Sequence, residues 1–442
     1  MLANKQVSYF VVGASSLLYI YLFYFISRND SIPLIITYSI LFASYLFMLK
    51  NSNEFNIRWL LGISLLLRMT PLFAIPALSD DFYRFIWDGR LWAAGINPFA
   101  GLPGDFLNEP ALVAKGITNE LYGLLNSPTH YTIYPPVPQY INWLAAKLFP
   151  DSIAYSVVLM RTLLIGAEMM GLVFIYLLLK KYNLKQHLLA IYALNPLVII
   201  EISGNLHHEG LMITFLLGFL YFNSQGKILK AAVMLALAIA SKLLPLMFLP
   251  FILLNLKKWL SFSATLLLSS ALLFLPLFDQ SFIIGMKDSL TLYYQNFEFN
   301  AGLYYVLREI GYWIYGYNAI ALIGKILFIL STVLIIILSI GLRLKRFNYT
   351  FSFTILYLTF ALLSLIFHPW YMLILLAMAP FTKFNFPIIW SYMIFLTYIG
   401  YSQLGFSENY YVIAVEFIGL LIALIIDVRN YHRSSLSLNE AP

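Results

Sequence analysis

The chain has 442 residues, of which 61% are hydrophobic and only 11% are charged. Soluble domains carry about 25% charged residues, so this composition excludes an ordinary soluble protein and indicates a chain that lies mostly in a lipid bilayer. The net charge of +7 suits a membrane protein with lysine-rich and arginine-rich cytoplasmic loops. It does not indicate nucleic acid binding, because no basic cluster lies outside short loops. The chain has no cysteine, which excludes disulfides, thiolate metal sites and cysteine nucleophiles.

About fourteen apolar segments follow one another along the chain, and a membrane-spanning helix needs roughly 20 such residues. They centre near residues 17, 40, 67, 166, 195, 216, 234, 249, 268, 330, 358, 375, 394 and 418. Polar residues interrupt the region 228–255, so the number could differ by two. The first segment has no small-residue cleavage site, and we expect it to be a retained helix. The prediction is an all-α polytopic membrane protein, residues 1–442 forming a single membrane domain of about 12–14 transmembrane helices.

The distribution of basic residues predicts the orientation of the chain in the membrane. Lysines and arginines gather in alternate short loops, namely 180–185, 227–230, 257–258, 343–346 and 429–433. With fourteen spans and Lys5 inside, all these loops face the cytoplasm. Two long loops, residues 79–151 and 279–318, then lie on the outer face. Both are rich in aromatic residues, so we expect ordered amphipathic helices in the membrane interface and not disorder.

The first outer loop opens with an acidic and aromatic stretch, SDDFYRFIWDGRLWAAGINPFA, residues 79–100. Ser79 or Asp80 can cap a helix that starts near Asp81, and Asp81, Arg84 and Asp88 then share one helix face. One interpretation is a capped interfacial helix with a salt-bridged polar side. The other interpretation is the edge of a functional site. We favour it because acidic residues at the end of a membrane span are energetically unfavourable unless they have a function. The turn at 95–98 would fold the loop back over the outer surface.

The order D-D-x-Y-R-x-x-W-D-G-R-x-x-x-x-G-I-N-P-F, followed by Y-P-P-x-x-Q, resembles the polytopic glycosyltransferases of the GT-C class. The most similar group is the bacterial polyprenyl-phosphate-sugar-dependent mannosyltransferase-like proteins. The specific motifs lie in residues 79–139. The resemblance implies a multi-pass enzyme of the bacterial inner membrane. It would move a hexose, with mannose favoured, from a polyprenyl-phosphate donor to a hydroxyl of a glycan, lipid or protein acceptor on the periplasmic or extracellular side.

This reaction needs charge neutralisation at the leaving phosphate and a carboxylate general base for the acceptor hydroxyl. By resemblance the base is Asp80 or Asp81. We favour Asp80, at the edge of the loop, and expect Arg84 to position Asp81. The substrate contacts expected from this loop are Tyr83, Arg84, Trp87, Asp88 and Tyr134. No cofactor is required, although a divalent metal could assist.

A second group of candidates lies between spans, at Glu201–Glu209. A zinc site is disfavoured because the H-E-x-x-H spacing is absent. We expect His207 or His208 to contact a phosphate or the acceptor hydroxyl, with Glu209 orienting it. Lys242, at a helix break, either snorkels to lipid headgroups or contacts a phosphate.

The last candidates lie in the second outer loop and beyond it. By resemblance, residues 297–304 lie near the donor, and the polar residues expected there are Asn296, Asn300, Tyr304, Tyr305 and Arg308. Arg308 could equally be a surface residue paired with Asp288 or Glu309. His368 lies at the start of a span. Its segment either resembles the same family or is an interfacial anchor. Arg161 and Glu168, inside one span, are expected to pair with each other or with the pocket.

Two other functions fit a polytopic membrane protein. A lipid-linked oligosaccharide flippase or transporter predicts charges at mid-membrane and two-fold repetition. A lipid-linked glycan ligase shares the architecture but uses a diphosphate donor. Polar residues concentrate at one face of this chain, which favours glycosyl transfer over transport.

Overall fold

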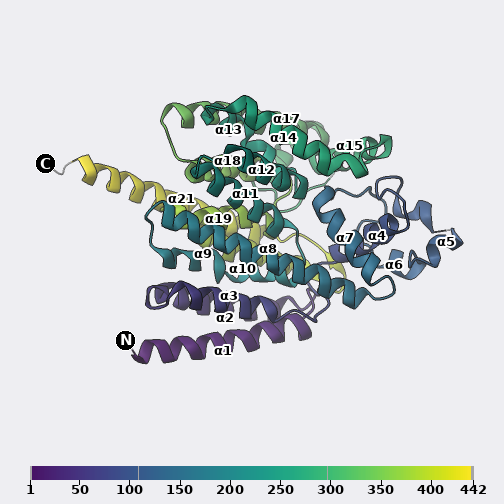
Figure 1. Cartoon of the computed structure of the whole chain (residues 1–442), viewed down its shortest axis with the longest axis horizontal. Helices are drawn as coiled ribbons and strands as arrows, with labels where there is room; N and C mark the ends of the chain where they lie inside the picture. Colours follow the sequence, from purple (N-terminus) through teal and green to yellow (C-terminus); the bar gives the residue numbers. More distant parts are fainter. Residues whose placement is uncertain (1, 108, 296, 440–442) are drawn as a thin grey trace.

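In the computed structural model, which describes residues 2–107, 109–295 and 297–439, the chain is a bundle of helices (Figure 1). Both termini lie at one end of the bundle, and helices α4 to α7 project from the opposite end. We call these the terminus end and the loop end. Two short strands, β1 (Tyr401–Ser402) and β2 (Gly405–Phe406), form an antiparallel hairpin.

Helices are labelled α and single turns of tighter 3-10 helix are labelled η, with η4 a π-helix. The first half contains α1 (Leu2–Phe25), α2 (Ser31–Lys50), η1 (Ser52–Glu54), α3 (Ile57–Met69), α4 (Asp81–Ala93), η2 (Pro103–Phe106), α5 (Pro110–Val113), α6 (Asn119–Gly123), α7 (Pro136–Leu148), α8 (Ile153–Lys181), η3 (Gln186–Leu189), α9 (Ala190–Ala193), α10 (Pro196–Val198) and η4 (Ile199–Gly204). The second half contains α11 (Glu209–Ser224), α12 (Ile228–Ser241), η5 (Leu244–Phe248), α13 (Leu249–Asn255), α14 (Trp259–Phe274), η6 (Leu275–Leu277), α15 (Gln280–Gln295), α16 (Gly302–Tyr315), α17 (Ile320–Leu344), α18 (Tyr349–Leu363), η7 (Pro369–Met372), α19 (Leu373–Met378), η8 (Ala379–Phe381), α20 (Phe386–Met393), η9 (Ile394–Gly400) and α21 (Tyr410–Asn439).

The predicted class, an all-α polytopic membrane protein, is confirmed. Among the described residues, 6 helices are long and apolar enough to cross a membrane, or up to 7 if the pair 186–193 and 196–204, bent by 52°, is one span. The long helices are Lys5–Phe25, Ser31–Lys50, Ile153–Lys181, Trp259–Leu277, Ile320–Leu344 and Tyr410–Tyr431. Among the described residues, shorter apolar helices of 10–17 residues are Glu209–Ser224, Ile228–Ser241, Leu244–Asn255, Tyr349–Leu363, Pro369–Phe381 and Phe386–Gly400. The predicted number of 12–14 spans therefore requires that the shorter helices also cross.

Short polar side chains mark where several of the helices begin. Asn56, Ser152 and Asn348 each precede a helix, and each side chain accepts a hydrogen bond from a backbone amide of its first turn. Such caps satisfy amides that have no carbonyl partner within the helix. They start α3, α8 and α18 at the boundaries between polar turns and apolar runs.

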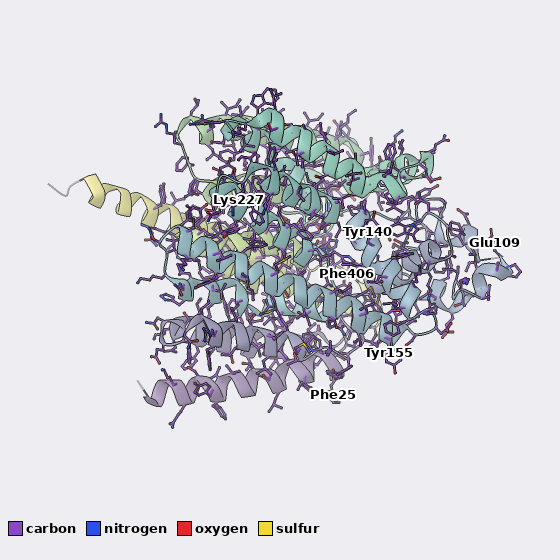
Figure 2. The ribbon with its side chains drawn as sticks, viewed as in Figure 1. Phe25, Glu109, Tyr140, Tyr155, Lys227 and Phe406 are labelled. Carbon is purple, nitrogen blue, oxygen red and sulfur yellow. The ribbon has the colours of Figure 1, made fainter. Side chains whose placement is uncertain are left out.

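The helices run alternately between the two ends of the bundle. Figure 2 shows Phe25, the last residue of α1, and Tyr155, near the start of α8, on the side of Glu109 and away from both termini. At the other end, Arg343 Nε donates to the carbonyl of Leu254 at 2.9 Å, which joins the ends of α17 and α13. The basic loops at 180–185, 227–230, 257–258 and 343–346 therefore lie toward the terminus end.

The two predicted outer loops differ in how they pack. Helix α4 packs closely on α7 of the same loop, where a Cβ at Gly89 would lie 2.2 Å from the carbonyl oxygen of Asn142. Gly89 of α4 therefore lies directly against α7. Helix α16 in the second loop instead exposes an apolar face, with Val306 at 59% and Trp313 at 85% of their surfaces accessible. That pattern suits an interfacial helix.

Candidate active site

Polar side chains from junctions far apart in the chain meet at the loop end of the bundle. They are Arg28 between α1 and α2, Asp80 and Asp81 at the start of α4, His207 and His208 after η4, Glu209 in the first turn of α11, Lys242 at the end of α12, and His368 before η7. Alternate junctions of the up-and-down helices converge here, so residues separated by more than 300 positions become neighbours. We call this set the junction cluster.

Asp81 lies in the first turn of α4 with its carboxylate partly open to solvent. Asn126 Nδ2 donates to Asp81 Oδ1 at 2.6 Å, and the Tyr134 hydroxyl donates to Oδ2 at 3.4 Å. The same Oδ2 lies 3.8 Å from His207 Nε2. Neutral donors therefore orient this carboxylate, and its other neighbour is an imidazole.

Asp80 has a different partner, the guanidinium of Arg28, with which it forms an ion pair. Arg28 also lies over the ring of Tyr401, with 5.2 Å from its central carbon to the ring centroid. The Asp80 side chain makes no capping bond among the described residues. Instead the Ser79 hydroxyl accepts a hydrogen bond from the Asp81 amide at 3.3 Å. Of the two candidate bases, Asp80 is thus the one already paired with a cation.

Tyr83, on the exposed side of the same helix turn, is half-buried against Phe82, with ring centroids 3.9 Å apart. Burial and the nearby carboxylate of Asp80 raise the pKa of Tyr83, so the phenol stays neutral. It borders the junction cluster and can offer a hydroxyl to a substrate. Its predicted role in substrate binding stays a prediction.

His207 is buried between two carboxylates. Its Nδ1 lies 3.0 Å from Glu201 Oε2, while Nε2 faces Asp81. The imidazole stacks on the indole of Trp370 with 3.8 Å between ring centroids. Burial opposes the imidazolium, but the carboxylates of Glu201, Asp81 and Glu209 outweigh it, so the pKa of His207 is raised.

His208 lies in an apolar environment. Its ring packs on Phe85 at 4.3 Å and Tyr134 at 5.9 Å between centroids. Neither ring nitrogen has a hydrogen-bond partner among the described residues. Burial, followed by the positive neighbours His207 and Lys242, lowers the pKa of His208 to about 3. His208 is therefore a neutral imidazole whose nitrogens are available to a bound molecule.

Glu209 and Lys242 form an ion pair, which differs from the prediction that Glu209 orients a histidine. The Lys242 ammonium also lies 4.2 Å from the centroid of the Tyr371 ring. Its side chain is 27% exposed, whereas that of Glu209 is 3% exposed. Lys242, predicted at the helix break, therefore lies in the junction cluster, and its ammonium-bearing side chain remains partly exposed.

His368 completes the cluster by stacking on Trp370 at 4.3 Å, with the two planes 11° apart. Burial and the positive charges of Lys242 and His207 lower the pKa of His368, so it too is neutral. His207, Trp370 and His368 thus form a continuous stack of rings along one side of the cluster.

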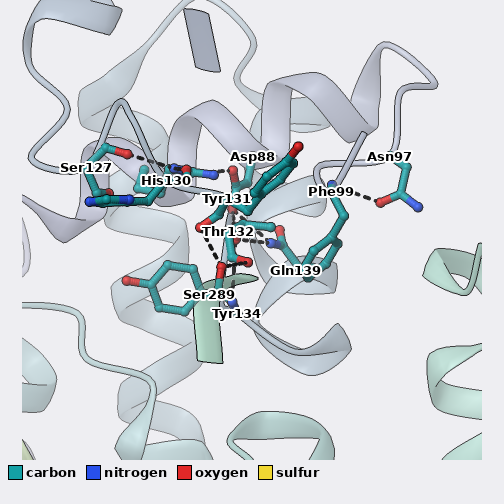
Figure 3. Close-up of polar contacts among 11 residues, drawn as sticks. Asp88, Asn97, Phe99, Ser127, His130, Tyr131, Thr132, Tyr134, Gln139 and Ser289 are labelled. Carbon is teal, nitrogen blue, oxygen red and sulfur yellow. Dashed lines mark hydrogen bonds and ion pairs between the residues drawn. The ribbon is translucent and has the colours of Figure 1, made fainter. Parts of the chain in front are cut away.

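Arg84 and Asp88 pair with each other in a buried network apart from this cluster. Figure 3 shows Asp88 of this network beside Thr132 and Gln139. Arg84 Nε donates to Asp88 Oδ1 at 2.8 Å, and Thr132 and Gln139 donate to the other carboxylate oxygen at 2.5 and 2.9 Å. The expectation that Arg84 positions Asp81 is therefore wrong. Arg84 pairs with Asp88 because Thr132 and Gln139, where the chain returns after the loop, place further hydrogen-bond donors at that carboxylate.

The same network ties the first outer loop together. Arg84 Nη1 donates to the backbone carbonyl of His130 at 2.8 Å, and Ser289 of α15 donates to the carbonyl of Thr132 at 3.2 Å. Trp87 is fully buried, and its indole nitrogen has no partner among the described residues. Arg84, Trp87 and Asp88 thus support the loop, and their predicted contacts with substrate stay untested.

The turn after α4 folds as expected, with Gly95 in the left-handed region at a φ of 87°. Asn97 then donates to the carbonyl of Leu277 at 2.9 Å and to Asp279 at 2.8 Å. The turn therefore fastens the first outer loop to the start of the second.

The predicted residues of the second outer loop form a separate cluster. Asn300 donates through its side chain to Glu416 at 3.0 Å and through its backbone to Glu408 at 2.7 Å. Tyr304 donates to Asn318 at 2.8 Å, and Arg308 pairs with Glu298 at 2.6 Å. Arg308 also pairs with Glu309 at 3.1 Å, as its surface interpretation predicted. Asn296 lies outside the described residues.

The buried charges inside the first spans pair differently from the prediction. Glu168 binds Arg68 of α3 through two hydrogen bonds of 2.9 and 2.8 Å. Arg161 instead donates to backbone carbonyls on two segments, including Ala74 at 2.6 Å and Ser203 at 2.6 Å. The expected pair of Arg161 and Glu168 is therefore wrong, because each finds a better-placed partner on another element.

Two neighbours of the candidate bases were not identified from the sequence, namely Arg28 and Asn126. Arg28 carried a usable signal, since an arginine in a short loop assigned to the outer side departs from the charge rule. Asn126 carried none, because it lies 45 positions from Asp81 in an irregular segment. In the part of the chain that the structure describes, no group of three or more histidine, aspartate or glutamate side chains is placed to hold a metal ion.

Comparison with known proteins identifies a family for this chain. The family model described as alpha-(1->6)-mannopyranosyltransferase, N-terminal domain, matches residues 27–258, just over half of the chain. The protein belongs to this family. The matched region contains Arg28, the aspartates of α4, the histidines after η4 and Lys242, but not the Asn300 cluster or His368.

A curated relative matches the chain over a shorter length. Alpha-(1->6)-mannopyranosyltransferase A from Mycobacterium tuberculosis (strain ATCC 25618 / H37Rv) is 28% identical over 192 residues, which is 41% of this chain and 34% of the relative. The aligned region thus spans about a third of the relative's length.

Proposed function

We propose that the protein is a membrane mannosyltransferase that moves mannose from a polyprenyl-phosphate donor to a hydroxyl of a glycan, glycolipid or protein. The observation that carries the proposal is the placement of Asp81, a partly exposed carboxylate among neutral donors, at the loop end of an apolar bundle that belongs to a mannosyltransferase family. A lipid-linked donor would reach this end from the bilayer, and a soluble or lipid-linked acceptor would reach it from the aqueous side.

In the proposed reaction the acceptor oxygen attacks the anomeric carbon of the sugar. The bond from that carbon to the phosphate oxygen breaks, and polyprenyl phosphate leaves. The acceptor proton passes to a carboxylate, which acts as general base. We assign this role to Asp81 and not to Asp80, because Asp80 is paired with Arg28 whereas Asp81 is held by Asn126 and Tyr134.

The leaving phosphate needs positive charge and not a strong acid. Lys242 and Arg28 are the cations of the junction cluster, and both side chains are about a quarter exposed, at 27% and 28%. A compact ammonium and a forked guanidinium both bind phosphate oxygens well. In this proposal Lys242 and Arg28 receive the donor phosphate, and the neutral His208 and His368 contact the sugar or the acceptor. A divalent metal is not required for these steps.

The charge distribution supports an orientation with the site outside. The basic loops lie toward the terminus end, opposite the junction cluster, and basic loops face the cytoplasm in membrane proteins. In a bacterial inner membrane the site would then face the periplasm or the cell exterior, where lipid-linked sugars serve as donors because nucleotide sugars are absent.

The test is transfer from labelled polyprenyl-phosphate mannose by the purified protein in lipid nanodiscs, with a membrane glycolipid extract as acceptor. We expect Asp81→Asn to lower the transfer rate at least about a hundredfold, and Asp80→Asn to weaken donor binding with a smaller loss of rate. Glu120→Gln, which alters an exposed carboxylate of the same loop, is the matched control and should transfer normally.

Other outcomes separate the alternatives. If Asp81→Asn and Asp80→Asn both transfer at the normal rate, neither carboxylate is the base. Movement of an uncleaved lipid-linked sugar across the membrane would indicate a flippase. Transfer that requires a diphosphate donor would indicate a ligase.

A further inference from the structure

Three side chains form a line that leads from the aqueous site into the buried core. Asp81 Oδ2 lies 3.8 Å from His207 Nε2, and His207 Nδ1 lies 3.0 Å from Glu201 Oε2. Glu201 is fully buried and His207 nearly so, whereas the Asp81 side chain is 21% exposed. A buried carboxylate and histidine are unfavourable in an apolar bundle unless they have a task. Stability alone does not account for this arrangement.

Both carboxylate oxygens of Glu201 also accept hydrogen bonds from neighbouring side chains. Asn205 Nδ2 donates to Oε2 at 3.0 Å, and the Tyr398 hydroxyl donates to Oε1 at 3.0 Å. These bonds hold the Glu201 carboxylate in place 3.0 Å from Nδ1 of His207. A proton on Nδ1 leaves Nε2 as a lone pair facing Asp81.

The backbone of this segment is also unusual. Residues 199–204 form a π-helix, η4, and Leu206 has a φ of 65°, in the left-handed region that disfavours a branched side chain. π-Helical turns and such strained residues occur often at functional sites. Here they end the span so that Glu201, Asn205 and His207 converge on one another.

We propose that His207, oriented by Glu201, accepts the proton that Asp81 takes from the acceptor hydroxyl. The inference rests on the proposed transfer reaction and adds a second proton-accepting residue to it. The acceptor O–H bond breaks as the new glycosidic bond forms, and its proton moves to Asp81. The proton then passes from Asp81 to Nε2 of His207, which restores the aspartate and forms an imidazolium stabilised by Glu201. The proton returns to water as product leaves.

The charges around His207 fit this role. Carboxylates face it from η4, from α4 and from the first turn of α11, at Glu201, Asp81 and Glu209, and they raise its pKa despite burial. The neighbouring histidines, His208 and His368, have lowered pKa values and stay neutral. His207 is therefore the imidazole of the cluster at which the surrounding charges favour a bound proton.

One test follows the protonation of His207 without any substrate. A protonated imidazole quenches the fluorescence of an indole stacked on it, and His207 stacks on Trp370. The difference in emission between the wild type and Trp370→Phe should fall as pH decreases, with a midpoint above the ordinary histidine value of 6.5. Glu201→Gln should move this midpoint to lower pH, because it removes the carboxylate that favours the imidazolium. His207→Gln should abolish the transition.

The second test measures transfer as a function of pH. Transfer by the wild type should decline on the acid side as His207 becomes protonated and can no longer accept a proton. In Glu201→Gln this decline should move to lower pH. His207→Gln should lose the decline and lower kcat about tenfold, less than the roughly hundredfold loss expected for a direct general base, because Asp81 still takes the proton from the acceptor. His130→Gln, at an exposed histidine of the first outer loop, is the matched control and should behave as the wild type.

The outcomes separate the two proposals. If the wild type transfers mannose but the acid decline is unchanged in Glu201→Gln and His207→Gln, the relay is wrong and the transferase proposal stands. If the fluorescence transition appears as expected but the wild type transfers no sugar, the transferase proposal fails, and the relay fails with it. A fluorescence midpoint that Glu201→Gln does not lower would overturn the assignment of Glu201.

Discussion

Asp81 and Asp88 lie seven residues apart on the same helix, α4, yet they occupy opposite kinds of environment. Asp88 is fully buried and receives hydrogen bonds from Arg84, Thr132 and Gln139. Asp81 is partly exposed, has no arginine among its described partners, and faces His207. The middle of the helix is therefore built to hold the loop together, and its first turn is left open for chemistry.

The comparison shows how one short helix serves two purposes. A fully buried carboxylate that is held by a guanidinium and two further donors is not accessible to a substrate. A carboxylate held by two neutral donors keeps its orientation and can still accept a proton. Changes in the middle of α4 should therefore alter stability, and changes in its first turn should alter transfer.

The largest stability effect is expected at Asp88. Asp88→Asn would leave the buried guanidinium of Arg84 without a counter-ion, and breaking a buried ion pair in this way costs about 3 kcal/mol. The free energy of unfolding, measured by thermal denaturation in detergent, should fall by about that amount. Asp81→Asn should unfold at the wild-type temperature while losing transfer. If Asp88→Asn unfolds at the wild-type temperature and loses only transfer, Asp88 does not have the structural role assigned to it.

A smaller loss is expected at the contact between α4 and α7. Gly89→Ala places a methyl group 2.2 Å from the carbonyl oxygen of Asn142, so the helices must separate. Overpacking of this kind costs about 2 kcal/mol and should appear as a lower denaturation temperature and faster proteolysis of the first outer loop. Gly62→Ala is the control, since a Cβ there meets nothing within 4 Å. Equal stability of the two variants would show that α4 and α7 do not pack this closely.

The smallest effect concerns the orientation of Asp81. Asn126→Ala removes the hydrogen bond of 2.6 Å to Asp81 Oδ1, and one such bond contributes about 1 kcal/mol. We expect kcat/KM for mannose transfer to fall about fivefold, with no change in the unfolding temperature because Asn126 is exposed. A loss as large as that of Asp81→Asn would mean that Asn126 itself contacts the substrate.

Local patterns predicted the features of α4 that depend on neighbouring residues. The helix begins at Asp81, as the polar residues before it indicated, and Gly95 ends it in a left-handed turn. The apolar segments were equally readable, because each follows from the composition of a single stretch. These features need no knowledge of the rest of the chain.

Partner choice could not be predicted, because it depends on segments distant in the sequence. Arg84 has acidic residues three positions before it and four after it, and helix spacing allows either pair. Only the return of the chain at 127–139, with its carbonyls, hydroxyl and amide, decides for Asp88. Arg28 likewise becomes the partner of Asp80 across 52 positions.

The meeting of Arg28 with Tyr401 has a consequence for how the protein is made. Arg28 belongs to the first turn between helices, and Tyr401 to the last hairpin before α21. A ribosome must therefore synthesise the chain as far as Tyr401 before these two side chains can meet. The early helices, with Asp80 and Arg28, enter the bilayer before Tyr401, which packs against Arg28, has been made. A chain that stops before Tyr401 would insert and remain in the membrane, yet it would lack one side of its site.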